Sequence, residues 1–246
     1  MKIKLDADKI KNLISPAYAD AEVYVYDRVD STNTRAKEDK TMSLGIICAR
    51  AQTAGRGRQG HTFYSPADTG LYMSIVLPMT PMQAYEFSLT AAAAVAAARA
   101  IDRLCNISAG IKWVNDLYLE GKKIAGILTE ADSDRVIVGI GINMTTEVFP
   151  ADLPGAGSLG KSIDPSQLAA VIFTELADMI SGGERSFMDE YRSRSILIGK
   201  TVDYTQNGTL KRARAVDIDE RGRLVIEDEL GQTHALDSGE IRIVMG

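Results

Sequence analysis

The sequence is poor in the residues that build metal centres and disulfide scaffolds. Its 246 residues include only two cysteines and two histidines. Cys48 and Cys105 lie far apart, each in apolar surroundings, which is typical of buried free thiols in a reducing compartment. A lone disulfide or a catalytic thiol is the alternative interpretation. No group of His and Cys has the spacing of a zinc site, so we assign no metal-ligating residues.

Long apolar runs and a surplus of positive charge are also missing. No stretch approaches the roughly 18 apolar residues that a membrane span requires. The first residues, Met1 to Leu5, lack the apolar run of a signal peptide. The formal net charge is −5, which argues against nucleic-acid binding by the whole surface. These absences predict a cytoplasmic protein without membrane contact.

What remains is an ordinary globular composition, with 45% hydrophobic and 25% charged residues. A chain of this length forms one large domain, or a large and a small one. Alternating or short apolar runs predict strands over residues 22–29, 44–51, 71–77, 111–113, 117–119, 122–129 and 135–142. Periodicity, helix propensity and capping residues predict helices over 31–40, 81–105, 165–180 and 184–195.

The pattern of predicted elements changes near residue 196. Short strands are predicted over 201–204, 211–218, 224–227 and 241–244, separated by glycine-containing turns. This pattern is typical of a small all-β module, closed as a barrel or a sheet. We therefore expect two domains, comprising residues 1–195 and 196–246.

The loop from Gly55 to Gly60 places Arg56 and Arg58 between glycines. Glycine lets the backbone approach a ligand and present its N–H groups to an anion, and arginine adds a permanent positive charge. Taken alone, the loop is equally well explained as an anion clamp or as a flexible turn with solvated arginines. It lacks the Gly-Lys-Ser/Thr of a phosphate-binding P-loop, and no helix opens on its last glycine.

Two further segments combine polar groups with strand ends. Lys112 to Asp116 is a polar cluster around Trp113, either a turn beside a core tryptophan or a site in which Lys112 faces a carboxylate or phosphate. Asp116 is then a candidate to help hold Mg²⁺. The strand from Gly139 to Asn143 contains two glycines, which either pack against the alanine-rich helix or form a backbone wall against a flat ligand. The same two interpretations apply to Gly126.

Together these segments resemble the biotin–protein ligases. The pieces that carry the resemblance, in the family's order, are Asp30-Ser31-Thr32-Asn33, Gln52-Thr53-Ala54-Gly55-Arg56-Gly57-Arg58, Gly70-Leu71-Tyr72-Met73-Ser74, Lys112-Trp113-Val114-Asn115-Asp116, Lys123-Ile124-Ala125-Gly126-Ile127-Leu128 and Gly139-Ile140-Gly141-Ile142-Asn143. The resemblance spans roughly residues 22 to 245. Two positions depart from it, because relatives often have arginine where Gln59 stands and proline where Val114 stands.

The resemblance implies an α+β fold: a mixed β-sheet with packed helices, similar to class II synthetases, followed by a small SH3-like β-barrel. It implies an ATP-dependent ligase that activates biotin as biotinyl-5′-AMP and transfers it to a lysine of a biotin carboxyl carrier protein or domain. Arg56, Arg58 and Lys112 are the expected catalytic residues, acting with Mg²⁺ on the phosphates. The expected binding residues are Ser31, Thr32, Asn33, Gln52, Gly55, Gly57, Phe63, Asp116, Gly126, Gly139, Gly141 and Asn143.

The resemblance also gives several of these residues a specific role. Ser31, Thr32 and Gln52 are expected to hydrogen-bond the ureido head of biotin, whose rings lie against Gly126 and residues 139–141. Phe63 takes the place of an aromatic residue that stacks on adenine, and Asn143 faces the phosphates or the metal. Residues 53–66 are expected to become ordered over the ligand.

Other activities fit parts of the same pattern. Lipoate or octanoate attachment uses a related scaffold, and a biotin-sensing repressor or binding module is a non-enzymatic alternative. Some family members repress transcription through an N-terminal helix-turn-helix domain. Only about 20 residues precede the first matching strand here, so we expect a ligase that does not bind DNA. A homodimer is expected slightly ahead of a monomer.

Overall fold

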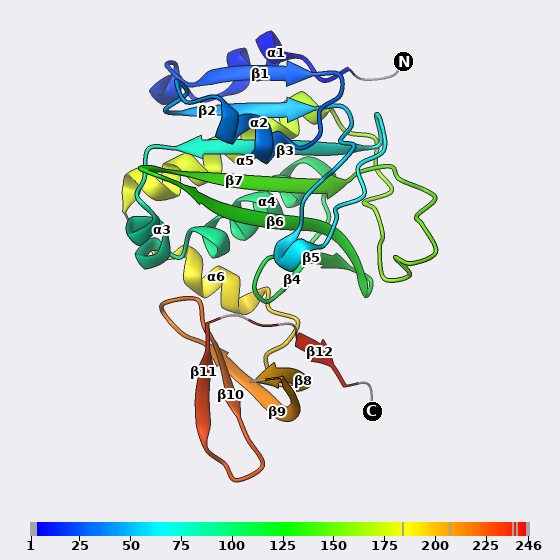
Figure 1. Ribbon diagram of the computed structural model, residues 1–246, viewed down its shortest axis with the longest axis vertical. Helices are drawn as coiled ribbons and strands as arrows, with labels where there is room; N and C mark the ends of the chain where they lie inside the picture. The colour runs from blue at the N-terminus through cyan, green and yellow to red at the C-terminus, as the bar shows by residue number, and fades with distance from the viewer. Residues whose placement is uncertain (1–3, 184, 207, 238, 240, 245–246) are drawn as a thin grey trace.

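The computed structural model describes residues 4–183, 185–206, 208–237, 239 and 241–244, which form two β-sheets with helices packed on the larger one (Figure 1). The helices are α1 (Ala7–Leu13), α2 (Thr32–Glu38), α3 (Pro81–Phe87), α4 (Leu89–Cys105), α5 (Pro165–Gly182) and α6 (Phe187–Ser193). The strands of the larger sheet are β1 (Glu22–Tyr26), β2 (Gly45–Ala49), β3 (Gly70–Leu77), β4 (Gly110–Lys112), β5 (Asp116–Leu119), β6 (Lys122–Asp132) and β7 (Arg135–Asn143).

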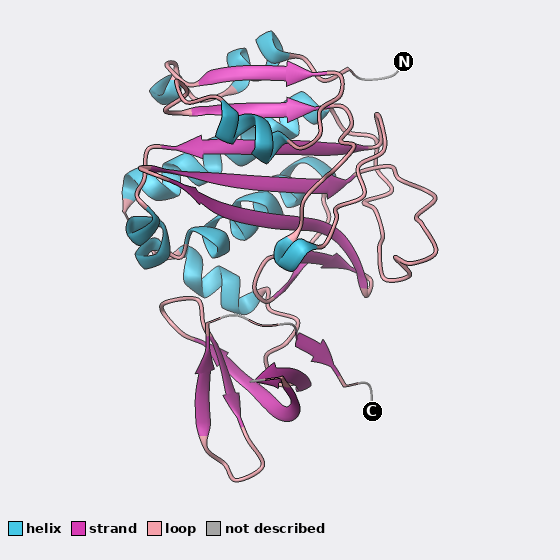
Figure 2. Cartoon of the chain, viewed as in Figure 1, coloured by secondary structure: helices cyan, strands magenta, loops and turns pink. Residues whose placement is uncertain are grey.

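The larger sheet has seven strands in the order β1-β2-β3-β7-β6-β5-β4. β1 runs parallel to β2 and every other neighbouring pair is antiparallel, which confirms the predicted mixed sheet. Glu120 and Gly121 connect β5 to β6, both with positive φ, as the predicted tight hairpin requires. Helices α4 and α5 cover one face, whereas α2 lies on the other (Figure 2). The face that carries α2 also carries the loop of residues 53–66.

The predicted single helix over 81–105 is wrong, because Ser88 divides it into α3 and α4. Ser88 adopts a left-handed conformation with φ 60° and ψ 48°. Its hydroxyl accepts a hydrogen bond of 2.7 Å from Arg185, which comes from a distant part of the chain. No Gly or Pro lies at the break, and the high helix propensity of the neighbouring alanines therefore favoured one continuous helix in the prediction. The break lets α3 and α4 take different directions over the sheet.

Helix α4 is buried on all sides along its middle. Residues 91–98 are seven alanines and Val95, and each of them is buried. A helix that is apolar all round lies in the interior of a protein, and α4 contacts β5 and β6 as well as α5 and α6. Because the side chains are small, the helix backbone approaches the sheet closely. The predicted packing of this helix flat on a sheet is confirmed.

One of the α-helices and one of the strands were not predicted from the sequence. Helix α1 begins at the N-cap Asp6, whose carboxylate accepts from the backbone N–H of Lys9, and only Ile10 of this helix is fully buried. Strand β11 (Thr233–Leu236) is exposed along most of its length and has no apolar face. Both lack the apolar periodicity on which the predictions depend. The predicted helix start at Glu184 lies outside the described residues.

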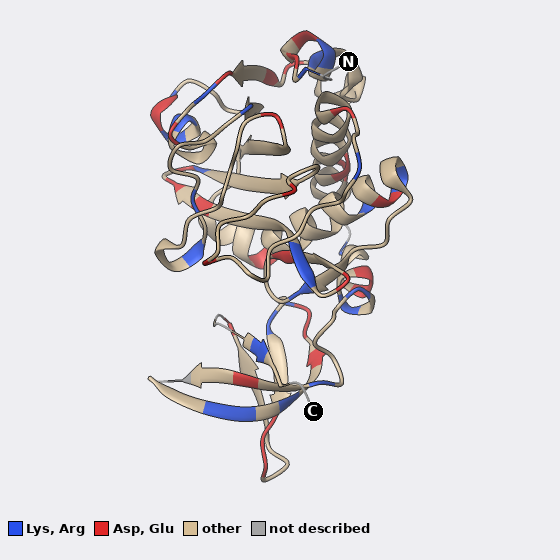
Figure 3. Ribbon diagram, turned by 90° about the vertical axis from the view of Figure 1, so that its right-hand side faces the viewer, with Lys and Arg blue, Asp and Glu red and all other residues tan. Residues whose placement is uncertain are grey.

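The smaller sheet confirms the predicted all-β module. It consists of β8 (Thr201–Gln206), β9 (Thr209–Ile218), β10 (Leu224–Glu227), β11 and β12 (Ile241–Ile243). All pairings are antiparallel, in the order β11-β10-β9-β8-β12. Lys/Arg and Asp/Glu residues are interspersed over both sheets in Figure 3, so the acid surplus is not gathered on one face of the view.

Both cysteines are free thiols, which makes the lone disulfide wrong. Cys48 is buried in β2, and burial raises the pKa of its thiol above the ordinary value. Cys105 ends α4 and is only partly buried, in contrast to the prediction of two buried thiols. In the part of the chain that the structure describes, no helix has the length and apolarity of a membrane span.

Candidate functional site

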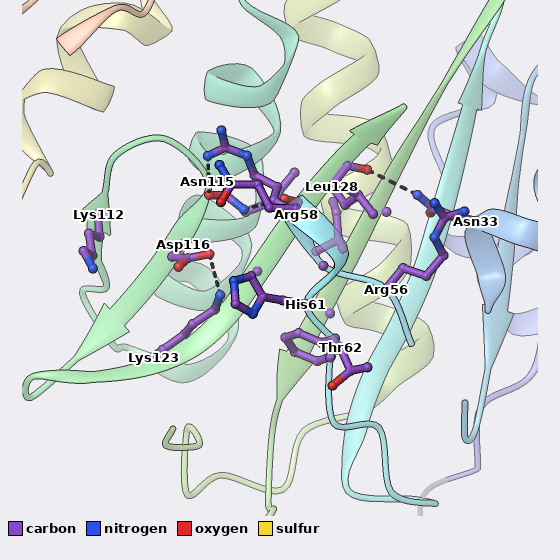
Figure 4. Close-up of a pocket in the computed structure, with 18 of the residues that line it drawn as sticks. Asn33, Arg56, Arg58, His61, Thr62, Lys112, Asn115, Asp116, Lys123 and Leu128 are labelled. Atoms are coloured by element: carbon purple, nitrogen blue, oxygen red, sulfur yellow. Dashed lines mark hydrogen bonds and ion pairs between the residues drawn. The ribbon is translucent and has the colours of Figure 1, made fainter. Parts of the chain in front are cut away.

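A cavity of about 300 Å³ lies on the face of the larger sheet that carries α2. Its floor is formed by β6 and β7, and its cover by the loop of residues 53–66 (Figure 4). Its walls come from the start of α2 on one side and from the β4–β5 turn on the other. Segments that are far apart in the sequence therefore meet at this cavity. They include the glycine-arginine loop, the polar segment around Trp113 and the glycine-containing strands β6 and β7.

The floor of the cavity is flat because three glycines share one face of β6 and β7. A Cβ atom on Gly139 would lie 2.3 Å from Oδ1 of Asn33, and one on Gly141 would lie 2.5 Å from the ring of Phe63. Gly126 is the cross-strand partner of Gly141 and also faces Phe63. These glycines point to α2 and the loop, so the predicted packing of Gly139 and Gly141 against the alanine-rich helix is wrong. They form the backbone wall that was the alternative.

One end of the cavity is a buried network of hydrogen bonds. The backbone N–H of Thr32 donates to Oε1 of Gln52 at 2.9 Å. The hydroxyl of Ser74 lies 2.8 Å from Oγ1 of Thr32 and 2.5 Å from Oδ1 of Asn33. Ser31, Thr32 and Asn33 are each buried. A buried set of hydroxyl and amide groups fixes the orientation of a polar ligand group.

The loop over the cavity is a hairpin, and we call residues Gly55–Phe63 the flap. The N–H of Phe63 donates to the carbonyl of Gly55 at 2.9 Å, and the N–H of Gly57 donates to the carbonyl of His61 at 2.7 Å. A Cβ on Gly55 would lie 2.4 Å from the carbonyl oxygen of Phe63, so the hairpin closes only around glycine. Gln59 sits at the exposed tip with φ 53°. The loop therefore has internal structure, unlike the flexible turn that the sequence also allowed.

Positive side chains surround the cavity in different ways. Arg58 donates to Oδ1 of Asn115 at 3.3 Å, and Lys123 lies 2.7 Å from Oδ1 of Asp116. Lys112 lies over the ring of Tyr118, 5.6 Å from its centroid. Figure 4 shows Lys123 pointing toward Asp116, with Lys112 apart from both. Nζ of Lys123 also lies 3.4 Å from the point where a Cβ on Gly126 would be, so this amine is close to the floor.

Arg56 points away from Arg58, toward α2 (Figure 4). Its guanidinium lies 3.1 Å from the carboxylate of Glu130. Burial alone raises the pKa of Glu130, but hydrogen bonds from Lys37 and Asn33 and the charges of Lys37 and Arg56 outweigh it. The pKa of Glu130 therefore lies below its ordinary value, and this carboxylate is charged at neutral pH.

The cavity brings together 13 of the 15 residues that the sequence indicated. These residues are Ser31, Thr32, Asn33, Gln52, Arg56, Gly57, Arg58, Phe63, Lys112, Asp116, Gly126, Gly139 and Gly141. Gly55 is the first residue of the flap and does not line the cavity, but it allows the hairpin to close. Asn143 is buried away from the cavity lining and donates to the carbonyl of Gly157 at 2.9 Å.

Other lining residues received no role from the sequence. Lys123 and Asn115 belong to segments that carried the resemblance, and their polar character next to Gly126 and Asp116 was the available signal. His61 and Thr62 lie on the flap. Gly239 and Ile241 reach the cavity from the smaller sheet, and no local pattern indicated them.

The described side chains of the cavity offer few ligands for a metal ion. Within the described ranges, no three His, Cys, Asp or Glu side chains gather into a metal-binding group. Of the lining residues that the structure describes, Asp116 is the acidic one, and Lys123 is its ion-pair partner. Mg²⁺ is usually bound through one or two carboxylates together with substrate phosphates. The donor set therefore fits a Mg²⁺ ion that arrives with a nucleotide, but not a resident ion.

Comparison with known families identifies both parts of the chain. Residues 25–145 match the biotin/lipoate A/B protein ligase family, and residues 197–243 match the biotin protein ligase C-terminal domain. The bifunctional ligase/repressor BirA of Bacillus subtilis is 32% identical over 93% of this chain and 76% of its own length. The biotin–[acetyl-CoA-carboxylase] ligase of Mycobacterium tuberculosis is 30% identical over 88% of this chain and 87% of its own length.

A solved structure shows the same arrangement. The biotin protein ligase of Aquifex aeolicus in complex with biotin and ATP has a TM-score of 0.79 and 26% identity, and the match covers 91% of this chain and 99% of that one. A point mutant of the Aquifex ligase in complex with biotin gives a TM-score of 0.80 at the same identity, covering 92% of this chain and 99% of that one.

Proposed function

The chain belongs to the biotin–protein ligase family and is an ATP-dependent biotin ligase, and we propose that its two reaction steps take place in the cavity under the flap. The observation that carries this proposal is the combination of a glycine floor, a buried hydrogen-bonding end and cationic side chains within one cavity. The floor and the buried end suit a flat, polar bicyclic ring. The cations suit a carboxylate that meets the phosphates of ATP.

We place the ureido head of biotin at the buried end, beside Thr32 and Gln52. Both already belong to one hydrogen-bonded network, so they are held in position before a ligand arrives. The rings of biotin then lie on Gly139 and Gly141. The ring of Phe63 contacts the same floor above Gly141 in this structure. We therefore propose that Phe63 moves off the floor when biotin binds and comes to lie against adenine.

In the first step, a carboxylate oxygen of biotin attacks the α-phosphorus of ATP. The new bond joins biotin to AMP, and the bond to the bridging oxygen breaks so that pyrophosphate leaves. Catalysis of such transfers depends mainly on positioning and on preorganised positive charge. We assign that charge to Arg58 and Lys123, with Lys112 at the edge of the cavity. Asp116 orients Lys123 through their ion pair.

In the second step, the amine of an acceptor lysine attacks the carbonyl carbon of the mixed anhydride. An amide bond forms, AMP leaves with the electron pair of the broken bond, and the amine loses a proton. The flap excludes water from the anhydride between the two steps. When Mg²⁺ binds with ATP it neutralises phosphate charge, and Asp116 is the residue that would contact it.

We propose the acceptor and the cellular setting from the names of the relatives and from the substrates of the reaction. The relatives named biotin–[acetyl-CoA-carboxylase] ligases indicate the carrier domain of a biotin-dependent carboxylase as the acceptor. Because ATP is a cytoplasmic substrate, we place the reaction in the cytoplasm.

We also propose a homodimer formed through the edge of β1, where Tyr24 and Tyr26 are exposed. Sedimentation of the wild type and of Tyr24→Glu tests that arrangement.

Exchange of labelled pyrophosphate into ATP tests the proposed function. We expect exchange with biotin and none with lipoate or octanoate, because the glycine floor and the buried polar end match a ureido ring. Transfer of labelled biotin to a purified carrier domain then tests the second step. Exchange that depends on lipoate instead would overturn the assignment.

A further inference from the structure

Glu130 on β6 joins three elements at the side of the cavity. Its side chain is only 13% exposed. One oxygen accepts from Nδ2 of Asn33 at 2.8 Å, and the other lies 2.7 Å from Nζ of Lys37 and 3.1 Å from Arg56. Asn33 and Lys37 belong to α2, whereas Arg56 belongs to the flap. One carboxylate thus connects the flap to the helix and to the sheet.

The two arginines of the flap are held on opposite sides of the cavity. Arg56 extends toward Asn33 and Arg58 toward Asn115 (Figure 4). Glu130 is charged and lies against both Lys37 and Arg56, so these three side chains together keep one net positive charge. Among the described residues, the hydrogen-bond acceptor of Arg58 is the neutral amide oxygen of Asn115, at 3.3 Å. The two side chains therefore have different partners, a carboxylate for Arg56 and an amide oxygen for Arg58, although both are arginine.

The position of Arg56 makes it an effective attachment point. The residue forms an isolated β-bridge with Thr62, so it lies across from the opposite arm of the hairpin. The hydrogen bonds from Gly57 to His61 and from Phe63 to Gly55 flank this bridge. A restraint on the Arg56 side chain therefore restrains both arms of the flap.

We infer that Glu130 is a positioning residue that tethers the flap through Arg56, so that the flap stays closed over biotinyl-adenylate. This inference rests on the proposed function. It assigns Arg56 the role of a tether and leaves Arg58 as the arginine that faces the reacting phosphate. Loss of the tether increases escape of the adenylate without removing a group that touches it.

Release of preformed biotinyl-adenylate in a pulse-chase experiment measures the tether. Glu130→Gln keeps an acceptor for Asn33 but removes the charge, and Arg56→Gln removes the partner. We expect each variant to release the adenylate about tenfold faster, which is the scale of one hydrogen bond to a charged group. The double variant should be no faster than either single variant, because both remove the same interaction.

A neighbouring ion pair provides the matched control. Lys40, two residues beyond the end of α2, lies 2.8 Å from Asp132 at the end of β6, and this ion pair includes no flap residue. Lys40→Gln should release the adenylate at the wild-type rate. An unchanged rate in Glu130→Gln, or multiplication of the two effects in the double variant, would overturn the inference.

Hydrogen exchange of the ligand-free protein gives a readout that does not depend on catalysis. The N–H groups of Gly57 and Phe63 should exchange faster in Glu130→Gln and in Arg56→Gln. Peptides from β10 and β11 should be unaffected, which separates loosening of the flap from general destabilisation. Unchanged exchange in the flap would count against the tether. If the wild type forms no adenylate, the proposed function fails, but this exchange result still tests the tether.

Discussion

Replacing Gly139 by alanine should destabilise the protein and weaken biotin binding at the same time. The new Cβ would lie 2.3 Å from Oδ1 of Asn33 and 2.9 Å from its Cγ. Asn33 cannot easily move aside, because its side chain is buried and both its amide oxygen and its amide nitrogen are hydrogen-bonded. Its Oδ1 accepts from Ser74 at 2.5 Å, and its Nδ2 donates to Glu130 at 2.8 Å and to the carbonyl of Leu128 at 3.3 Å.

The size of the effect follows from those three hydrogen bonds. If each contributes about 1 kcal/mol, their loss lowers the free energy of unfolding by roughly 2–3 kcal/mol. For a chain of this size, that corresponds to a decrease in Tm of roughly 5–10 °C. Thermal denaturation followed by circular dichroism measures the decrease, and biotin-dependent pyrophosphate exchange measures the accompanying rise in KM for biotin.

Two other glycine-to-alanine changes separate this mechanism from a general effect of alanine. In Gly141→Ala the three atoms nearest to the new Cβ all belong to the ring of Phe63, the first at 2.5 Å, and that ring belongs to the flap and can swing away. Its Tm should fall less than that of Gly139→Ala, whereas its KM for biotin should rise. Gly182→Ala, near the end of α5 with no atom within 4 Å of the new Cβ, should leave both unchanged. A wild-type Tm for Gly139→Ala would refute the role assigned to Asn33.

Three further predictions concern charge. Lys123→Met should lower kcat/KM for pyrophosphate exchange by about 100-fold, the scale of one preorganised contact to a developing charge, and Lys112→Met should lower it much less. Arg58→Gly should still form biotinyl-adenylate but release it, so that bystander lysines are labelled; full retention of the adenylate would contradict the flap mechanism. Because the pKa of Glu130 is lowered from 4.5, its contribution to stability is complete above that pH and is lost as the pH falls through the lowered value. Urea denaturation between about pH 6 and pH 3 should show this loss, and Glu130→Gln should reduce it.

The parts of the fold that could be predicted are those in which local pattern and tertiary structure agree. β2 and β3 are apolar runs because both faces of these strands are covered, and the composition alone shows this. The glycines at 126, 139 and 141 could also be interpreted, because glycine inside a strand indicates a close approach. Which partner approaches could not be read from the strand itself, since Asn33 and Phe63 lie about 100 and 80 residues away.

The features that were missed depend on contacts between distant residues. The left-handed Ser88 accepts a hydrogen bond from Arg185, and nothing near residue 88 in the sequence indicates it. Arg56 and Arg58 looked equivalent because both lie between glycines. Glu130, which makes them different, lies in a strand whose alternating pattern gives a charged residue no special meaning. The sequence shows where charged residues stand along the chain, but the fold determines which of them become ion-pair partners.

The boundary near residue 196 marks a change of fold, but the site extends across it. Nε1 of Trp113, in the segment beside Asp116, donates to the carbonyl of Gly222 at 2.8 Å. Gly222 belongs to the smaller sheet's β9–β10 turn, and Gly239 and Ile241 line the cavity from the same sheet. Trp113 lies close in sequence to Asn115 and Asp116, which contact Arg58 and Lys123, so this hydrogen bond joins the smaller sheet to the segment on the cationic side of the cavity. We therefore propose that residues of the expected second domain, 196–246, contribute to the site together with those of the expected first domain, 1–195.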